Sequence, residues 1–322
     1  SDGISADYLL GPDDYMISRP DPTGGSRTID LSASLVNNFI AGENGTSDTI
    51  IGGLGNDLIF GRTGDNNLNG GDGADLLVGG SGAGDGDLLD GGLGSDTMVG
   101  LAGNDSYVVD DAGDVVVEAL NAGTDEVLTE LAAFSLELIA NVENLTYTGI
   151  DADPFVGTGN ALNNVISGGD LADTLAGLGG NDTLNGGIGI DLLDGGEGND
   201  TLNGGDDDDT LLGAAVTHTL NGRDGNDILA RDLANDAMNG GAGDDTFLVD
   251  NTADTVIEGA GGGTDTVQSS VTFTITDADV ENLTLVGTGN INATGNGSAN
   301  VLTGNAGNNT LNGGGGTPTA KY

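Results

Sequence analysis

The residues with the clearest chemical potential are aspartates that recur every nine positions in two long blocks. The nonapeptide Gly195–Asn203 shows the pattern, with glycine at positions one, two and four, aspartate at position six and leucine at position eight. The glycines permit a tight turn with positive φ, and the leucine is expected to face inward from a short strand. Carboxylates gathered on successive turns supply the oxygen ligands that calcium prefers. The repeat therefore predicts an all-β, calcium-binding solenoid.

The sixth-position aspartates are the candidate metal ligands. Nine residues per half-coil place aspartates eighteen apart on the same side, where two can share an ion. The expected pairs are Asp57 with Asp75, Asp75 with Asp96, Asp87 with Asp105, Asp173 with Asp191, Asp182 with Asp200, Asp191 with Asp209, Asp209 with Asp227, and Asp227 with Asp245. The pair of Asp75 and Asp96 must absorb three extra residues in the glycine-rich segment 81–86, which we expect to form a surface loop.

The repeat resembles the RTX family of secreted, hemolysin-type calcium-binding proteins. The resemblance implies a right-handed parallel β-roll, in which turn carbonyls complete the six to eight oxygens that calcium takes. Carried onto this sequence, those carbonyls belong to Gly186, Gly187, Gly189, Gly195, Gly196 and Gly198. The resemblance also implies an extracellular location reached through type I secretion.

Some turns depart from the repeat. Asn66 and His218 replace the sixth-position aspartate, and Asp207 and Val216 replace the fourth-position glycine. We expect calcium sites at these turns to be weak or absent. His218 is the only histidine, and as a base or zinc ligand it would need convergent partners. A degenerate repeat is the favoured interpretation.

Composition limits the classes of partner. The formal net charge is -46, so the metal-free chain repels itself and compact folding should require cations. Six lysines and arginines cannot form a phosphate-binding surface, which excludes nucleic acid and anionic membrane surfaces as partners. The sequence has no apolar stretch long enough for membrane insertion. Cysteine is absent, so metal rather than disulfides would hold an extracellular fold together.

The chain divides into six expected segments. These are an extended arm or linker over 1–37, a β-roll over 38–108, a β-rich flank over 109–163, a second β-roll over 164–248, a second β-rich flank over 249–299, and a terminal coil and tail over 300–322. The two flanks are copies of each other, so a larger unit has been duplicated. Glu118, Glu143, Glu258 and Glu281 occupy duplicated flank positions and are interpreted as structural.

The motifs of common hydrolases and phosphate-binding enzymes are missing from the sequence, and a single histidine removes most Ser-His and Cys-His schemes. We therefore expect no catalysis in this chain. The sequence favours an extracellular, calcium-dependent structural or assembly protein that self-associates in a surface layer, fibre or adhesin. The unfinished, uncapped C-terminal coil favours polymerisation.

Two alternatives remain open. The chain can instead be the calcium-folding module of a type I secreted enzyme or toxin whose catalytic part lies outside it. The flanks can also bind a cell-surface polysaccharide, although their aromatic residues fit core strands better than a sugar platform. The residues concerned are Phe134, Tyr147, Phe155 and Phe273.

Overall fold

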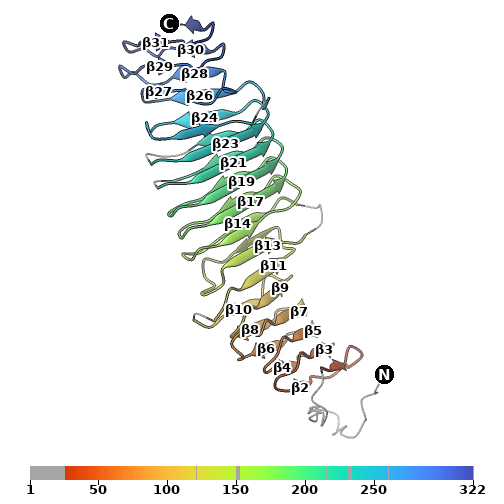
Figure 1. Cartoon of the computed structure of the whole chain (residues 1–322). Helices are drawn as coiled ribbons and strands as arrows, with labels where there is room; N and C mark the ends of the chain where they lie inside the picture. The colour runs from red at the N-terminus through yellow and green to blue at the C-terminus, as the bar shows by residue number, and fades with distance from the viewer. Residues whose placement is uncertain are drawn as a thin grey trace. The chain divides into compact units, whose positions relative to one another are not determined.

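A computed structural model describes residues 26–120, 122–149, 153–214, 216–230, 234–259 and 261–321. Every regular element in these ranges is a β-strand, and the paired strands are parallel (Figure 1). The all-β class and the parallel β-solenoid are thus confirmed. The chain forms two compact units, 1–149 and 150–322. In the described residues no helix is long and apolar enough to cross a membrane.

Unit 1 is a coil with two parallel sheets. Successive strands from β1 to β11 belong alternately to the first and the second sheet. Its first sheet contains, in spatial order, β1 (Thr28–Asp30), β3 (Thr49–Gly53), β5 (Asn67–Gly73), β7 (Leu88–Gly94), β9 (Ser106–Val109), β11 (Glu126–Thr129) and β13 (Asn144–Tyr147). Its second sheet contains β2 (Phe39–Ala41), β4 (Leu58–Phe60), β6 (Leu76–Gly80), β8 (Thr97–Leu101) and β10 (Val115–Val117), and β12 covers Ala133–Ser135.

Unit 2 repeats this plan. One sheet contains β15 (Val165–Ser167), β17 (Thr183–Ile188), β19 (Thr201–Asp206), β21 (Thr219–Asp224), β23 (Ala237–Ala242) and β25 (Thr255–Ile257). The second contains β14 (Val156–Thr158), β16 (Thr174–Ala176), β18 (Leu192–Asp194), β20 (Thr210–Leu212), β22 (Ile228–Ala230), β24 (Thr246–Val249), β26 (Thr266–Ser269), β28 (Asn282–Leu285), β30 (Val301–Thr303) and β32 (Thr319–Lys321). A small third sheet contains β27 (Phe273–Thr274), β29 (Ala293–Thr294) and β31 (Leu311–Asn312).

The core is a ladder of the eighth-position side chains. Leu184 lies opposite Leu202 in one sheet, and Leu193 lies opposite Leu211 in the other, each pair being one eighteen-residue coil apart. All four side chains are fully buried. Because each coil buries only two such residues, one on each sheet, little apolar volume is needed and strand register follows directly from the nine-residue period.

The three-residue insertion is absorbed in a loop. Around it the paired residues change from eighteen to twenty-one positions apart, as in Leu68 with Leu89 and Leu77 with Met98. The loop closes through the N–H of Asp85, which donates to the carbonyl oxygen of Gly82 at 3.0 Å. The predicted surface loop is confirmed, since the register on both sheets is kept.

The flanks continue the coil. In unit 1, β10 pairs with β8 and β11 pairs with β9, and in unit 2, β26 pairs with β24. Within the segment 1–37, expected to be an extended arm or linker, β1 (Thr28–Asp30) pairs with β3, and residues 1–25 lie outside the described residues. The six-segment division stays a prediction.

Candidate metal centres

Each of the twelve predicted aspartate ligands lies at a turn, one residue before the first residue of a strand. Asp182, for example, precedes Thr183, the first residue of β17. All twelve predicted aspartate ligands are buried, and none is more than 3% exposed: Asp57, Asp75, Asp87, Asp96, Asp105, Asp173, Asp182, Asp191, Asp200, Asp209, Asp227 and Asp245. Buried carboxylates require hydrogen bonds, an ion partner or a proton.

Hydrogen bonds join each predicted pair of aspartates. The backbone N–H of Asp191 donates to Oδ1 of Asp209 at 2.8 Å, one coil further along the chain. The same bond connects all eight predicted pairs, with N to Oδ1 distances between 2.6 and 2.8 Å. The structure therefore brings the members of each pair onto adjacent turns. Sharing of an ion within a pair stays a prediction.

The other carboxylate oxygen is the one available to a cation. In eleven of the twelve aspartates Oδ2 is buried and accepts no hydrogen bond within the described chain. Asp173 is the exception, because its Oδ2 accepts the backbone N–H of Gly169 at 2.6 Å. A column of buried carboxylate oxygens without hydrogen-bond donors destabilises the folded state unless a bound cation or protons neutralise the negative charge. The residues present thus fit bound calcium.

Two of the six implied glycine carbonyls lie beside these oxygens. The space above Gly177 is bounded by Oδ2 of Asp182 and the carbonyl oxygen of Gly195, and the equivalent space above Gly168 is bounded by Asp173 and Gly186. A Cβ atom would fill either space. Oxygen ligands from a carboxylate and from the next coil's backbone therefore converge there, as calcium coordination requires.

The other four implied glycines are distinguished by their backbone conformation and by close approach to the preceding coil. Their φ angles are all positive, between 86° and 126°: Gly187, Gly189, Gly196 and Gly198. A side chain at each would overlap backbone atoms of that coil. These positions explain why the turn needs glycine, independently of any role for their carbonyls.

Burial governs the electrostatics of the metal-free roll. It raises the pKa of Asp75, Asp191, Asp209 and Asp245 to about 7, although the backbone N–H bond to each Oδ1 opposes the shift. Burial likewise raises the pKa of Asp96, Asp182 and Asp227 to about 6. Neighbouring carboxylates add to these shifts. The folded, metal-free chain therefore tends to bind protons at the positions where a cation would bind.

At the two degenerate turns a nitrogen-bearing side chain takes the place of the carboxylate. Nδ2 of Asn66 donates to the carbonyl oxygen of Gly64 at 2.7 Å and to Oδ1 of Asp87 at 3.0 Å. Nδ1 of His218 accepts the backbone N–H of Asp200 and lies 3.3 Å from Oδ2 of that residue. Burial lowers the pKa of His218, but the interactions with Asp200 and Ala214 and the charge of Asp236 together outweigh burial, so the pKa is raised. Both side chains reduce the need for a cation at their turns.

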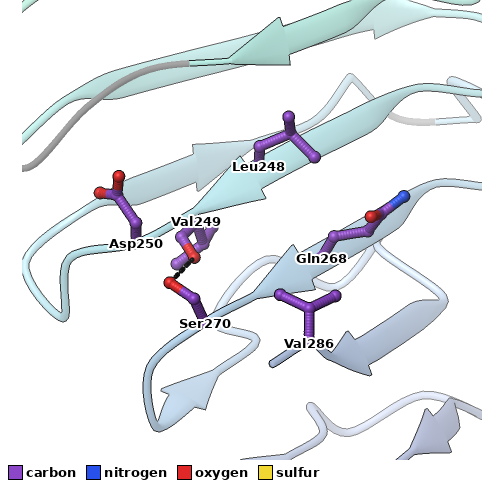
Figure 2. Close-up of a pocket in the computed structure, with 6 residues that line it drawn as sticks. All are labelled: Leu248, Val249, Asp250, Gln268, Ser270 and Val286. Carbon is purple, nitrogen blue, oxygen red and sulfur yellow. Dashed lines mark hydrogen bonds between the residues drawn. The ribbon is translucent and has the colours of Figure 1, made fainter. Parts of the chain in front are cut away.

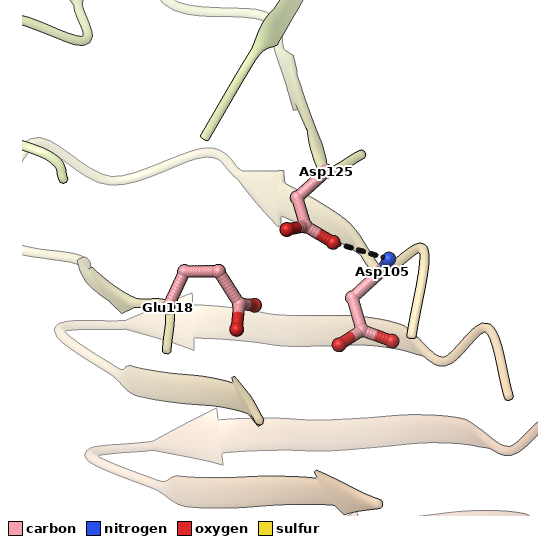
Figure 3. A group of neighbouring side chains, drawn as sticks. All are labelled: Asp105, Glu118 and Asp125. Carbon is pink, nitrogen blue, oxygen red and sulfur yellow. Dashed lines mark hydrogen bonds between the residues drawn. The ribbon is translucent and has the colours of Figure 1, made fainter. Parts of the chain in front are cut away.

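Two acidic residues of the following flank join the last aspartate of each roll. In unit 1, Glu118 and Asp125 lie beside Asp105 (Figure 3), and in unit 2, Glu258 and Asp265 lie beside Asp245. Their spacings of thirteen and twenty residues do not fit the nine-residue repeat, so the period could not identify them. Retention of both acids in the two flank copies was the available signal.

The nonapeptides were compared with known protein families. A family model for the RTX calcium-binding nonapeptide repeat (4 copies) matches residues 44–77, 51–85, 81–116, 158–193, 186–215 and 292–319. These matches include ten of the twelve predicted aspartate ligands, and Asp227 and Asp245 lie beyond the match that ends at residue 215. The chain belongs to the RTX calcium-binding repeat family. No curated protein matched the chain in a search of full sequences.

A pocket outside the RTX turns lies on unit 2 (Figure 2). It has a volume of about 200 Å³ and is lined by Leu248, Val249, Asp250, Gln268, Ser270 and Val286. Asp250 is the only titratable residue in this lining, so the pocket offers no pair of groups for acid and base catalysis. Among the proposed sugar-binding aromatics, Phe155 and Phe273 are buried and cannot present a ring face.

Neutralising one uninterrupted aspartate is expected to weaken calcium-dependent folding. Asp209 is bonded to both Asp191 and Asp227, so Asp209→Asn should affect two predicted sites. We expect the calcium concentration at the folding midpoint to rise about tenfold, equivalent to roughly 1.4 kcal/mol. Asp236→Asn is the matched comparison, because the adjacent turn carries His218. Circular dichroism during calcium titration measures both, and equal shifts would contradict the pairing scheme.

Proposed function

We propose that this RTX chain is an extracellular protein whose β-rolls fold around calcium and serve a structural or assembly role, as in a surface layer, fibre or adhesin. The observation that carries the calcium requirement is the column of buried Oδ2 atoms without donors. Nine of the eleven predicted ligands with such an Oδ2 lie within the matched repeats. Calcium would be held by these carboxylates together with the turn carbonyls.

The charge of the chain supports a calcium requirement. Eight ions at the predicted pairs would contribute sixteen positive charges against a formal net charge of -46. That neutralisation lowers the self-repulsion of the folded chain most strongly at the turns, where carboxylates are closest. Binding free energy then becomes folding free energy, because the site does not exist in the unfolded chain.

An extracellular location agrees with this chemistry. RTX repeat proteins are generally secreted through type I systems. Extracellular calcium modules commonly bind with dissociation constants of about 10⁻⁴ to 10⁻³ M, an affinity suited to the calcium concentration outside the cell. A chain without cysteine can use such an ion in place of disulfides. Folding would then follow arrival outside the cell.

Self-association is supported by two equivalent strands at the ends of sheets. β10 ends the second sheet of unit 1, and β25 ends the first sheet of unit 2. Three of their four outward side chains are apolar and exposed, with Val115 at 49%, Val117 at 44% and Ile257 at 49%, and the fourth belongs to Thr255. Edge strands with apolar outer residues are templates for pairing with another chain.

Sedimentation velocity tests the proposed role. The purified chain is measured with chelator, with millimolar calcium, and with magnesium at the same concentration as the control for ionic strength. Large assemblies that form with calcium and dissolve with chelator support the structural role. A compact calcium-bound monomer would instead support a folding module of a secreted enzyme or toxin. A chain that sediments identically in all three conditions would contradict calcium-dependent folding.

A further inference from the structure

Each roll ends in a cluster of three buried carboxylates, of which the nonapeptide provides only one. In unit 1 the cluster consists of Asp105, the last aspartate of the roll, with Glu118 and Asp125 from the flank (Figure 3). One ligand oxygen from each lies within 4.8 Å of the other two. The residues are 1%, 8% and 1% exposed, so water cannot solvate three negative charges there.

The hydrogen bonds around this cluster leave two oxygens without donors. Oδ1 of Asp105 accepts the N–H of Asp87 at 2.8 Å, and Oδ1 of Asp125 accepts the N–H of Asp105 at 2.8 Å. Glu118 accepts the N–H of Ala119 at Oε1 and the Tyr107 hydroxyl at Oε2. Oδ2 of Asp105 and Oδ2 of Asp125 are buried without a hydrogen bond. Backbone donors thus fix the carboxylates and leave these two atoms available.

The cluster occurs a second time in unit 2. Asp245, Glu258 and Asp265 meet the same distance condition and are 1%, 8% and 0% exposed. Here three oxygens lack donors, namely Oδ2 of both aspartates and Oε1 of Glu258. Phe247 stands where the first cluster has Tyr107, so the hydroxyl donor is missing. The same three acids are therefore assembled independently in two units.

A glycine opens space beside each cluster. A Cβ on Gly100 would overlap Oδ2 of Asp105 and Oε2 of Glu118, and a Cβ on Gly240 would overlap Oδ2 of Asp245 and Oε1 of Glu258. Neither glycine has a positive φ, so backbone conformation does not require glycine there. Glycine is needed at these two positions because a Cβ atom would overlap the carboxylate oxygens of the cluster.

We propose that each cluster is a calcium site of its own kind, in which three side-chain carboxylates of a roll and its flank bind one ion. The two-carboxylate turns of the roll rely on backbone carbonyls, whereas these sites concentrate three negative charges. Oxygens bound to one calcium ion at 2.3–2.6 Å lie at most about 5 Å apart, which the 4.8 Å limit satisfies. All-oxygen ligands disfavour zinc, which is bound mainly by cysteine and histidine.

The site joins the roll to its flank where the period changes. Along the rolls the aspartate bonds span eighteen residues, or twenty-one across the inserted loop, but the bonds from Asp105 to Asp125 and from Asp245 to Asp265 each span twenty. An ion at this point neutralises the acids that the altered spacing brings together. The site goes beyond the proposed function, because it concerns the flanks and does not depend on assembly or location.

Glu118→Gln tests the first site in the full chain. Glutamine keeps an oxygen acceptor for Tyr107 and removes the charge. Glu137→Gln is the control, since Glu137 is an exposed glutamate of the same unit. We expect Glu118→Gln to bind one calcium ion fewer than the control in equilibrium dialysis at low calcium, with an unchanged far-ultraviolet spectrum at saturating calcium. An equal number of ions in the two folded variants would overturn the proposal.

Terbium luminescence supplies a second readout that does not depend on loss of stability. Tyr107 contacts Glu118, so excitation of tyrosine should produce terbium emission that falls in Glu118→Gln and in Tyr107→Phe but not in Glu137→Gln. At the second site, Phe247→Tyr should gain emission, and adding Glu258→Gln should abolish that gain. Failure of Phe247→Tyr to gain emission while the chain is folded would overturn the second site.

The two proposals fail differently. If neither the wild-type chain nor Glu137→Gln binds calcium, calcium-dependent folding of the rolls is wrong. If both bind calcium and fold, but Glu118→Gln retains every ion and all tyrosine-sensitised emission, only the cluster site is wrong.

Discussion

Chelation of calcium at neutral pH is expected to unfold both rolls, and mild acid is expected to restore compact structure to the metal-free chain. The cause is the set of buried aspartates whose carboxylates have one oxygen without a donor. At neutral pH these groups must be ionised in water but are destabilised as anions inside the roll. Calcium or protons can both remove that penalty.

The direction of the pH effect follows from the pKa values. Burial raises the pKa of Asp191, Asp209 and Asp245 from 3.8 to about 7 in the metal-free fold. A group with a raised folded pKa stabilises the fold fully below its unfolded pKa, and that contribution disappears as pH rises through the folded value. The metal-free roll should therefore lose stability between about pH 4 and pH 7, and the calcium requirement should grow over the same window.

The measurement is circular dichroism with sedimentation velocity from about pH 4 to pH 8, with chelator and with saturating calcium. The calcium-saturated chain is the control, and its folded fraction should vary little over that range because the carboxylates are held as ligands. A metal-free chain that is equally folded at both ends of the range would contradict the proposed origin of the calcium requirement.

The fold was predictable because one period sets both structure and register. A leucine every nine residues, with glycine between, places successive leucines on opposite sheets and every second one in register. Leu184 and Leu202 confirm this arrangement. The pairing of aspartates follows from the same period, as in Asp191 with Asp209. No long-range information was needed for these features.

The different roles of the two carboxylate oxygens, Oδ1 as a hydrogen-bond acceptor and Oδ2 as the oxygen without a donor, could not be predicted from the sequence. Whether Oδ1 of Asp209 accepts a backbone N–H, leaving Oδ2 available, depends on the pitch between coils and the rotamer at the turn. The terminal clusters were missed for a related reason. Glu118 follows β10 and Asp105 precedes β9, in the other sheet. Their separation of thirteen residues matches no repeat, so their proximity is seen only in the folded coil.

Replacing a tight-turn glycine is expected to be the most damaging single substitution in unit 2. Gly198 has a φ of 126°, and a Cβ on it would overlap the carbonyl group of Gly180 on the preceding coil. The coils cannot separate there without losing the bonds from Gly180 N–H to Glu197 and from Glu197 N–H to Leu178. We expect Gly198→Ala to cost about 2 to 5 kcal/mol, the sum of about 1 to 3 kcal/mol for overpacking and about 1 to 2 kcal/mol for an L-residue in a left-handed conformation.

Gly287→Ala separates steric overlap from backbone strain. Gly287 also has a positive φ, 76°, but a Cβ there would have no atom within 4 Å. Its cost should be limited to about 1 to 2 kcal/mol for an L-residue in a left-handed conformation. Urea denaturation of both variants at saturating calcium gives the comparison. Similar urea midpoints would show that adjacent coils can move apart at the turn, and that their close approach does not explain the glycines of the repeat.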